Sequence, residues 1–307
     1  MEHLGFIGFG EAPYNFTRDL DRAIVKVFAY DVAAKGQDLR GETIRKNAAE
    51  NEVTLVESIE DLTECCNIVF CFTSANSALP IACQIAPLMR QGTVYVDLNS
   101  TSPATKEEIG KTFANSNADF VEAAVMASVP ANRTKVPIYV CGKRGRALAD
   151  MLNPAGTNIH FLGEKLGAAS ATKMLKSVLF KGFIALLTET VFATDHYGIT
   201  EEVLGALKHM MLEEMTYEQC CNYFVEAAAK DSVRMSQEMG QVVETLESMG
   251  ENSIMAQAAK RKLEWLTEQG YCKHFVTRPH GYAEVLSYKR ELDSGETSRI
   301  KTIADKM

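Results

Sequence analysis

The stretch Leu4-Gly5-Phe6-Ile7-Gly8-Phe9-Gly10-Glu11-Ala12-Pro13 decides the fold of this chain. It begins with a short apolar run, which predicts a buried strand over residues 4–8. Gly8 permits a tight turn, and Gly10 removes a side chain where backbone must approach a ligand. Apolar residues then recur at helical spacing and predict a helix over 11–23. A strand, a glycine turn and a helix N-terminus in this order present free N–H groups to an anion.

The turn therefore predicts a pyrophosphate site, with Gly8, Gly10, Glu11 and Ala12 as cofactor-binding residues. Pro13 stands where the dinucleotide fingerprint has its third glycine. Proline fits a first helical turn, but it supplies no N–H and adds bulk where helix and strand meet. The open alternative is that the glycines only shape a turn. The strand before them and the helix after them favour nucleotide binding.

Asp31 follows a second predicted strand over residues 24–30 and lies 31 − 10 = 21 residues after Gly10. This spacing matches the acidic residue that binds a ribose 2′-hydroxyl in dinucleotide-binding folds. A carboxylate there repels a 2′-phosphate, so NAD is favoured over NADP as the cofactor. Lys35 and Arg40 are near in sequence and leave NADP open.

Strands and helices alternate through the first half of the chain and then give way to helices alone. Further strands are predicted over residues 53–56, 68–72, 94–98, 120–125, 138–141 and 159–162. From residue 166 the predicted helices cover 166–197, 201–214, 217–249 with a break near Gly240, and 253–268. The predicted fold is α/β: a Rossmann-type doubly wound parallel sheet (domain 1–163), followed by an all-α domain (164–307).

Composition excludes several classes of function. The chain has 307 residues, of which 32 are basic and 40 acidic, and its net charge of −8 gives no basic footprint for nucleic acid. Eight cysteines show no zinc-ligand spacing, so no metal is expected and free thiols in the cytoplasm are predicted.

No membrane span is expected. The most apolar stretch, residues 174–193, contains Lys176, Lys181 and Glu189, which a bilayer core resists. The first residues, MEHLGFIGFG, lack the basic start and cleavage site of a signal peptide.

Polar side chains gather in three later segments, residues 97–103, 122–128 and 167–173. The first follows a predicted strand, at the sheet edge where open α/β folds bind ligands. Lys173 interrupts an apolar helix just beyond the domain junction, where clefts form, and this favours a functional amine. A solvated helix face is the alternative, and it suits Lys176.

Four motifs at sensible spacing then point to a family. They are GFIGFG (5–10), VDLNSTSP (96–103), FVEAAVMASV (120–129) and GAASATKMLKS (167–177). Together they resemble the β-hydroxyacid dehydrogenase family, which includes 3-hydroxyisobutyrate and 6-phosphogluconate dehydrogenases. The helical half resembles its less characterised 6-phosphogluconate-dehydrogenase-like branch. The resemblance implies an NAD(P)-binding Rossmann domain, a helical domain that dimerises, and an active site between them for a small-molecule substrate.

The resemblance also implies roles for single residues. Lys173 matches the catalytic lysine of the family. Asn99 and Ser100 match positions that contact the cofactor or substrate near the nicotinamide. Phe72 and Thr73 match the loop that lies along the dinucleotide.

Two departures concern the substrate. Met126-Ala127-Ser128 replaces the usual Ser-Gly-Gly loop, and Ser177 replaces an asparagine four residues after the lysine. These positions are the predicted substrate-binding residues. Lys230 is added to them because it matches a lysine that lines the cleft in the family, with a charge on the helix surface as the alternative. Because the usual groups hold a carboxylate and a hydroxyl, their loss weakens the case for a small hydroxy acid. Met126 suggests a more apolar or bulkier substrate.

The leading hypothesis is hydride transfer between NAD and the hydroxyl of a hydroxy-acid-like substrate, with Lys173 as general acid and base. Two alternatives stay open: an NADPH-dependent imine reductase, and a non-catalytic dinucleotide-binding protein.

Overall fold

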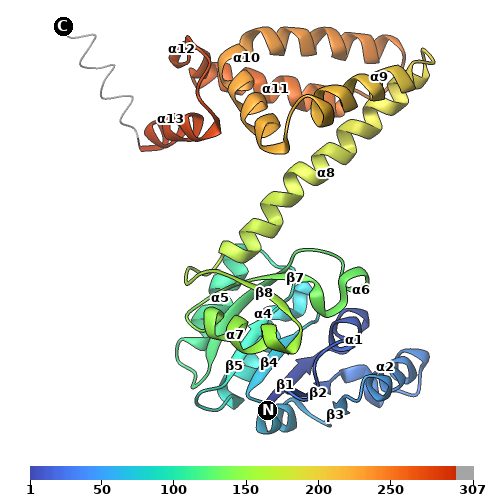
Figure 1. Ribbon diagram of the computed structural model, residues 1–307, viewed down its shortest axis with the longest axis vertical. Coiled ribbons are helices and arrows are strands. Elements are labelled where there is room, and N and C mark those ends of the chain that lie inside the picture. Colours follow the sequence, from blue (N-terminus) through green and yellow to red (C-terminus); the bar gives the residue numbers. More distant parts are fainter. Residues whose placement is uncertain (295–307) are drawn as a thin grey trace, which may run out of the picture. The chain divides into compact units, whose positions relative to one another are not determined.

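Eight strands build one sheet in the order β3-β2-β1-β4-β5-β6-β7-β8 (Figure 1). A computed structural model describes residues 1–294, and the chain divides into two compact units, residues 1–179 and 180–307. The sheet lies in the first unit. Its strands are β1 (Glu2–Ile7), β2 (Val25–Tyr30), β3 (Thr54–Leu55), β4 (Ile68–Cys71), β5 (Val94–Asp97), β6 (Asp119–Val125), β7 (Pro137–Cys141) and β8 (Asn158–Gly163).

The strand order reverses at β1, which has β2 on one side and β4 on the other. In doubly wound sheets, ligands bind outside the carboxyl ends of the strands at such a reversal. The predicted fold class is confirmed, with one exception to its parallel sheet. β7 runs antiparallel to β6, because only residues 126–136 connect them, and a parallel crossover needs a dozen or more residues.

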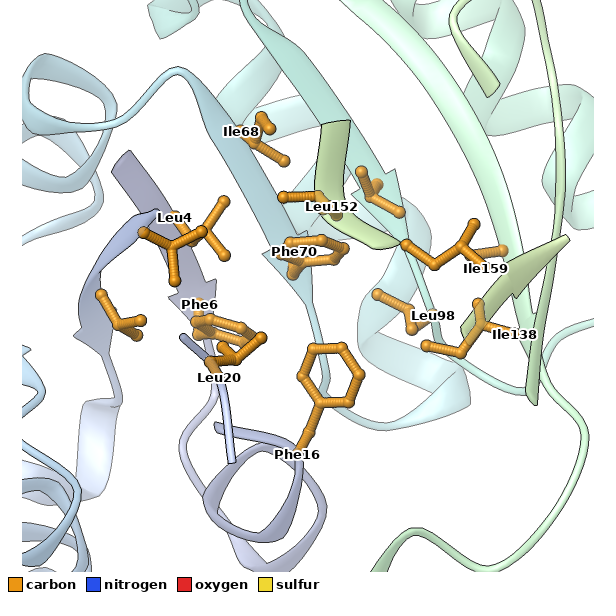
Figure 2. Close-up of a cluster of buried hydrophobic side chains, with 14 of the residues drawn as sticks. Leu4, Phe6, Phe16, Leu20, Ile68, Phe70, Leu98, Ile138, Leu152 and Ile159 are labelled. Carbon is orange, nitrogen blue, oxygen red and sulfur yellow. The ribbon is translucent and has the colours of Figure 1, made fainter. Parts of the chain in front are cut away.

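Helices cover the sheet and bury an apolar layer on each of its faces (Figure 1). On one face, Phe6 of β1 stacks on Phe70 of β4 at 5.2 Å between ring centroids, and Phe16 packs against both (Figure 2). The helices of this unit are α1 (Glu11–Thr17), α2 (Leu39–Glu50), α3 (Ile59–Cys65), α4 (Ala78–Ile85), α5 (Pro103–Phe113), α6 (Val129–Asn132) and α7 (Gly145–Leu152).

Helix α1 is shorter than the sequence predicts. It ends at Thr17 and not at residue 23, and side chains satisfy carbonyl groups of its last turn. Arg22 donates to the Thr17 carbonyl at 3.0 Å, and the Asn51 amide donates to the Tyr14 carbonyl at 2.7 Å.

The second unit is helical, as predicted. Helix α8 (Ala168–Asp195) begins in the first unit and continues into the second. It is followed by α9 (Thr200–Lys208), α10 (Tyr217–Ser248), α11 (Ile254–Glu268), α12 (Tyr271–His274) and α13 (Tyr282–Ser294). The expected break near Gly240 is wrong. The non-helical residue in α10 is Asp231, with φ −104° and ψ 16°, and Gly240 lies in regular helix.

Helix α8 exposes much of its apolar surface. By length and composition alone it could cross a membrane. Its Glu189, however, accepts hydrogen bonds from the Met255 and Ala256 N–H groups, at 2.8 Å each, and so caps α11. This carboxylate is therefore part of the helical packing of the second unit. The exposed large apolar side chains of α8 are Met174, Leu175, Val178, Leu179, Phe180, Phe183, Ile184, Leu186 and Phe192.

Candidate functional site

The glycine turn after β1 has the geometry that its sequence predicts. Gly8 adopts φ +84°, a conformation that side chains disfavour. A Cβ at this position would lie 2.3 Å from the Phe72 carbonyl oxygen. The Gly8 N–H also donates to the Tyr30 carbonyl at 2.8 Å. Only glycine fits, and the turn ties together the ends of β1, β2 and β4.

Gly10 leaves the N-terminus of α1 open. It is the N-cap residue of the helix, it is exposed, and a Cβ there would meet nothing within 4 Å. Pro13 is buried in the first helical turn. Backbone N–H groups in this turn have no acceptor within the helix, so the absence of an N–H at Pro13 costs the helix no hydrogen bond. The backbone around Gly10 can thus approach an anion, as pyrophosphate binding requires.

Asp31 holds a negative charge at the end of β2. Its carboxylate accepts from the Phe9 N–H at 2.8 Å and from the Ala33 N–H at 2.9 Å. Asp31 is buried, with 7% of its surface exposed. Its hydrogen bond to Phe9 stabilises the glycine turn, and each carboxylate oxygen can still accept a hydrogen bond from a further donor.

A cavity of about 800 Å³ lies at the strand-order reversal and collects five of the predicted cofactor residues. Arg40 also lines it. The open N-terminus of α1 and the room left by the glycines suit this cavity to a dinucleotide. Glu11 lines a neighbouring cavity of about 670 Å³, and Ala12 packs against the core. The five residues in the larger cavity are Gly8, Gly10, Asp31, Phe72 and Thr73.

Asn99 joins the loops that follow β4 and β5. Its side-chain oxygen accepts from the Thr73 N–H at 2.6 Å. Its side-chain nitrogen donates to Asp97 Oδ1 at 2.5 Å and contacts Cys71 Sγ at 3.2 Å. All of its polar groups therefore have protein partners. In this structure Asn99 positions the loop that carries Ser100.

A buried ion pair lies behind Asn99. Lys106 of α5 donates to Asp97 Oδ2 at 2.6 Å, to the Asp97 carbonyl at 2.8 Å and to the Ala123 carbonyl at 3.3 Å. Both side chains are fully buried. The pair was not predicted. Asp97 was visible in its polar segment, but nothing local marks Lys106 as its partner.

Lys173 lies at the carboxyl end of β5. Its Nζ donates to Ser100 Oγ at 2.6 Å, across 73 residues of sequence. The side chain is half-buried, and this burial lowers the pKa of its amine. The positive charges of Lys106 and Lys176 lower that pKa further. A lowered pKa increases the fraction of neutral amine, and the neutral amine is the form that can accept a proton.

Glu122 of β6 fixes the start of α8. Its fully buried carboxylate accepts from the Gly167 N–H and, at 2.6 Å, from the Ser170 N–H. A carboxylate at a helix N-terminus is favoured by the helix dipole. Since Lys173 is three residues beyond Ser170, the contact with Glu122 helps to fix the position of the Lys173 side chain.

The predicted substrate residues are placed in different parts of the chain. Met126 is partly buried against the first turn of α8, and Ala127 and Ser128 are exposed. The Ser177 hydroxyl donates to the Lys173 carbonyl at 3.0 Å. Lys230 lies on α10 in the second unit, one residue before the kink.

The contact that Lys176 makes was also not predicted. Lys176, interpreted from sequence as a solvated charge, is exposed, and its Nζ donates to the Met126 carbonyl at 2.7 Å. The three-residue spacing from Lys173 was the available signal, since residues so placed share a helix face.

A doubly wound sheet with a glycine turn, an open helix N-terminus and an acid after β2 defines an NAD(P)-binding Rossmann domain. Residues 3–163 match the model of the NAD binding domain of 6-phosphogluconate dehydrogenase, and residues 195–266 match a domain of unknown function, DUF1932. The chain belongs to the β-hydroxyacid dehydrogenase family of NAD(P)-dependent enzymes.

The chain is also similar to individual proteins. Human mitochondrial 3-hydroxyisobutyrate dehydrogenase is 22% identical over 213 residues, which are 67% of this chain and 61% of that protein. The chain therefore spans less than two thirds of that relative. A conserved hypothetical protein from Sinorhizobium meliloti 1021 is 32% identical, with TM-score 0.62 over 86% of this chain and 88% of that one.

The same fold occurs in an imine reductase from Bacillus cereus. Its TM-score is 0.71 over 89% of this chain and 95% of that chain, at 15% identity. This likeness is one of fold alone.

Proposed function

We propose that this protein is an NAD-dependent oxidoreductase that interconverts a hydroxyl and a carbonyl group, with Lys173 as general acid and base. The supporting observation is the Lys173 amine, 2.6 Å from Ser100 Oγ, in the unit that carries the dinucleotide cavity. The lowered pKa of this amine supports the role.

The chemistry requires two transfers. Oxidation of an alcohol removes a hydride from carbon and a proton from oxygen, and leaves a carbonyl group. Bound NAD⁺ supplies the hydride-accepting chemistry. Lys173 Nζ takes the hydroxyl proton in its neutral form and returns it in the reverse reaction. Ser100 Oγ holds the amine in place and is the second polar atom available to the substrate oxygen.

NAD is the proposed cofactor because Asp31 holds its charge at the end of β2. A 2′-phosphate at this point meets a buried carboxylate, and Arg40 is the cavity residue that could offset the repulsion. Calorimetric titration should give a Kd for NAD⁺ at least tenfold below that for NADP⁺. Equal affinities would contradict the assignment.

Gly10→Ala tests the cofactor site. A methyl group at position 10 meets no protein atom within 4 Å, so the variant should keep its melting temperature. It should weaken NAD⁺ binding about tenfold or more, because the methyl occupies the backbone's approach to the phosphates. Unchanged binding would exclude this cavity as the cofactor site.

Turnover separates the hypotheses. Wild-type protein is assayed with NAD⁺ and a panel of short hydroxy acids, and with NADPH and cyclic imines. We expect NAD⁺ reduction with hydroxy acids. Imine reduction alone would support the imine reductase alternative, and NAD⁺ binding without any turnover would support the non-catalytic one.

We also propose that the protein is a homodimer that pairs through α8. Val178 and Phe183 are 70% and 46% exposed. Apolar surface of this extent on one helix favours association. Light scattering should give about twice the mass of 33.8 kDa. Val178→Asp with Phe183→Asp should halve it, whereas a monomeric wild type would contradict the proposal.

A further inference from the structure

Two lysine amines lie one helical turn apart on α8 without an acidic partner. Lys173 Nζ contacts Ser100 Oγ, and Lys176 Nζ contacts the Met126 carbonyl. Neither amine is within 4.0 Å of a carboxylate of residues 1–294.

The two fully buried acids of this unit, Asp97 and Glu122, already have partners. The Asp97 carboxylate pairs with Lys106. The Glu122 carboxylate accepts the backbone N–H groups at the start of α8. Lys173 and Lys176 are thus left with neutral acceptors only among residues 1–294, so no described carboxylate pairs with either amine.

This arrangement leaves hydrogen-bonding capacity unused. An ammonium group has three N–H donors, and each of these amines has one protein acceptor. Like charges one turn apart on a helix repel each other. An anion between them would relieve the repulsion and accept the free donors. A carboxylate is one such anion, and a compact ammonium on a flexible stem can bind it as a point charge.

We propose that Lys176 is the residue that selects the substrate, by binding its carboxylate while Lys173 faces its hydroxyl. The proposal rests on the proposed function of Lys173. The Met126 carbonyl orients the Lys176 amine, so Met126 acts here through its backbone. The replacement of the usual substrate loop is thus compensated by a charge from the helix.

The spacing of Lys173 and Lys176 on α8 also bears on the distance between the hydroxyl and the carboxylate of the substrate. Residues three apart on a helix have Cβ atoms roughly 5–6 Å apart. Because the two side chains leave the helix side by side, we expect a substrate whose hydroxyl and carboxylate are close together, on neighbouring or next-neighbouring carbons. A long hydroxy acid with the same charge should be a poor substrate.

The test measures a ratio of two substrates. The probes are 3-hydroxybutanoate and its methyl ester, which share the hydroxyl and differ in charge, with NAD⁺ as oxidant. Lys176→Met should lower the acid-to-ester ratio of kcat/KM about 10- to 100-fold, mainly through KM for the acid. Lys176→Arg should keep most of the ratio. Lys165→Met, which removes an exposed lysine just before α8, is the control and should leave the ratio unchanged.

The length of the substrate gives a second readout. 6-Hydroxyhexanoate should have a kcat/KM at least tenfold below that of 3-hydroxybutanoate. An acid-to-ester ratio that Lys176→Met leaves unchanged would overturn the proposal, even in an active enzyme.

Equilibrium binding separates this proposal from the proposed function. Binding of 3-hydroxybutanoate to the NAD⁺-loaded protein is measured by calorimetry, which needs no turnover. Binding that Lys176→Met weakens tenfold or more supports the anion site, even if no alcohol is oxidised. Ester turnover without any affinity for the acid would overturn the anion site and leave the proposed function intact.

Discussion

Removal of the Lys106 ammonium is the perturbation whose outcome the structure defines most sharply. This fully buried amine donates to Asp97 Oδ2, to the Asp97 carbonyl and to the Ala123 carbonyl. In Lys106→Met the chain length is kept, but the Asp97 carboxylate stays in the core without a cation. Breaking a buried pair at one partner costs about 3–5 kcal/mol. The free energy of unfolding of the first unit should fall by that amount.

Hydrogen exchange is the suitable assay. The only tryptophan, Trp265, lies in the second unit, so its fluorescence does not report on β5. A loss of about 3 kcal/mol should make peptides from β5 and β6 exchange roughly 100-fold faster. Lys111→Met removes an exposed lysine of the same helix and should change nothing.

The double variant Lys106→Met with Asp97→Asn completes the test. It removes both charges of the buried pair, so it should recover more than half of the lost free energy. The reasoning would be refuted if Lys106→Met exchanged hydrogen at the wild-type rate. It would also be refuted if the double variant exchanged as fast as Lys106→Met alone.

Three further results are expected. Gly8→Ala should lower the melting temperature and abolish NAD⁺ binding, because its Cβ would lie 2.3 Å from a backbone carbonyl oxygen; a stable variant that binds NAD⁺ would contradict this. Glu122→Gln should lower kcat while the Kd for NAD⁺ stays constant, because an NH2 group replaces one of the two oxygens that accept the N–H groups at the start of α8; an unchanged kcat would exclude the positioning role. The rate of oxidation should rise with pH as Lys173 loses its proton, at a pH below the ordinary lysine pKa of 10.5, and Lys176→Met should move this rise to higher pH because one positive neighbour is gone; a shift to lower pH would be inconsistent with that coupling.

The parts of the site that depend on local sequence could be predicted. The strand, glycine turn and helix at Gly8 and Gly10 are neighbours in the chain, so pattern and backbone preference suffice. Asp31 needed only the spacing between two elements. The antiparallel direction of β7 was missed, although the short connection between the two predicted strands was visible in the sequence.

Contacts between distant residues could not be predicted in the same way. Lys106 has an ordinary position in an amphipathic helix, and only the folded sheet brings Asp97 to it. Glu122 is 45 residues from Gly167. Lys176 has the sequence context of a surface charge, and its contact with Met126 depends on where β6 ends. For such residues, the partner is set by tertiary structure.

The exchange of Lys173 for methionine tests the central claim most directly. Methionine keeps a linear side chain of similar size but cannot take up a proton. We predict a fall in kcat of about 10²–10⁴-fold for alcohol oxidation, with the Kd for NAD⁺ within twofold of wild type. Lys165→Met should behave as wild type in both measurements. Turnover by Lys173→Met close to that of the wild type would contradict the account.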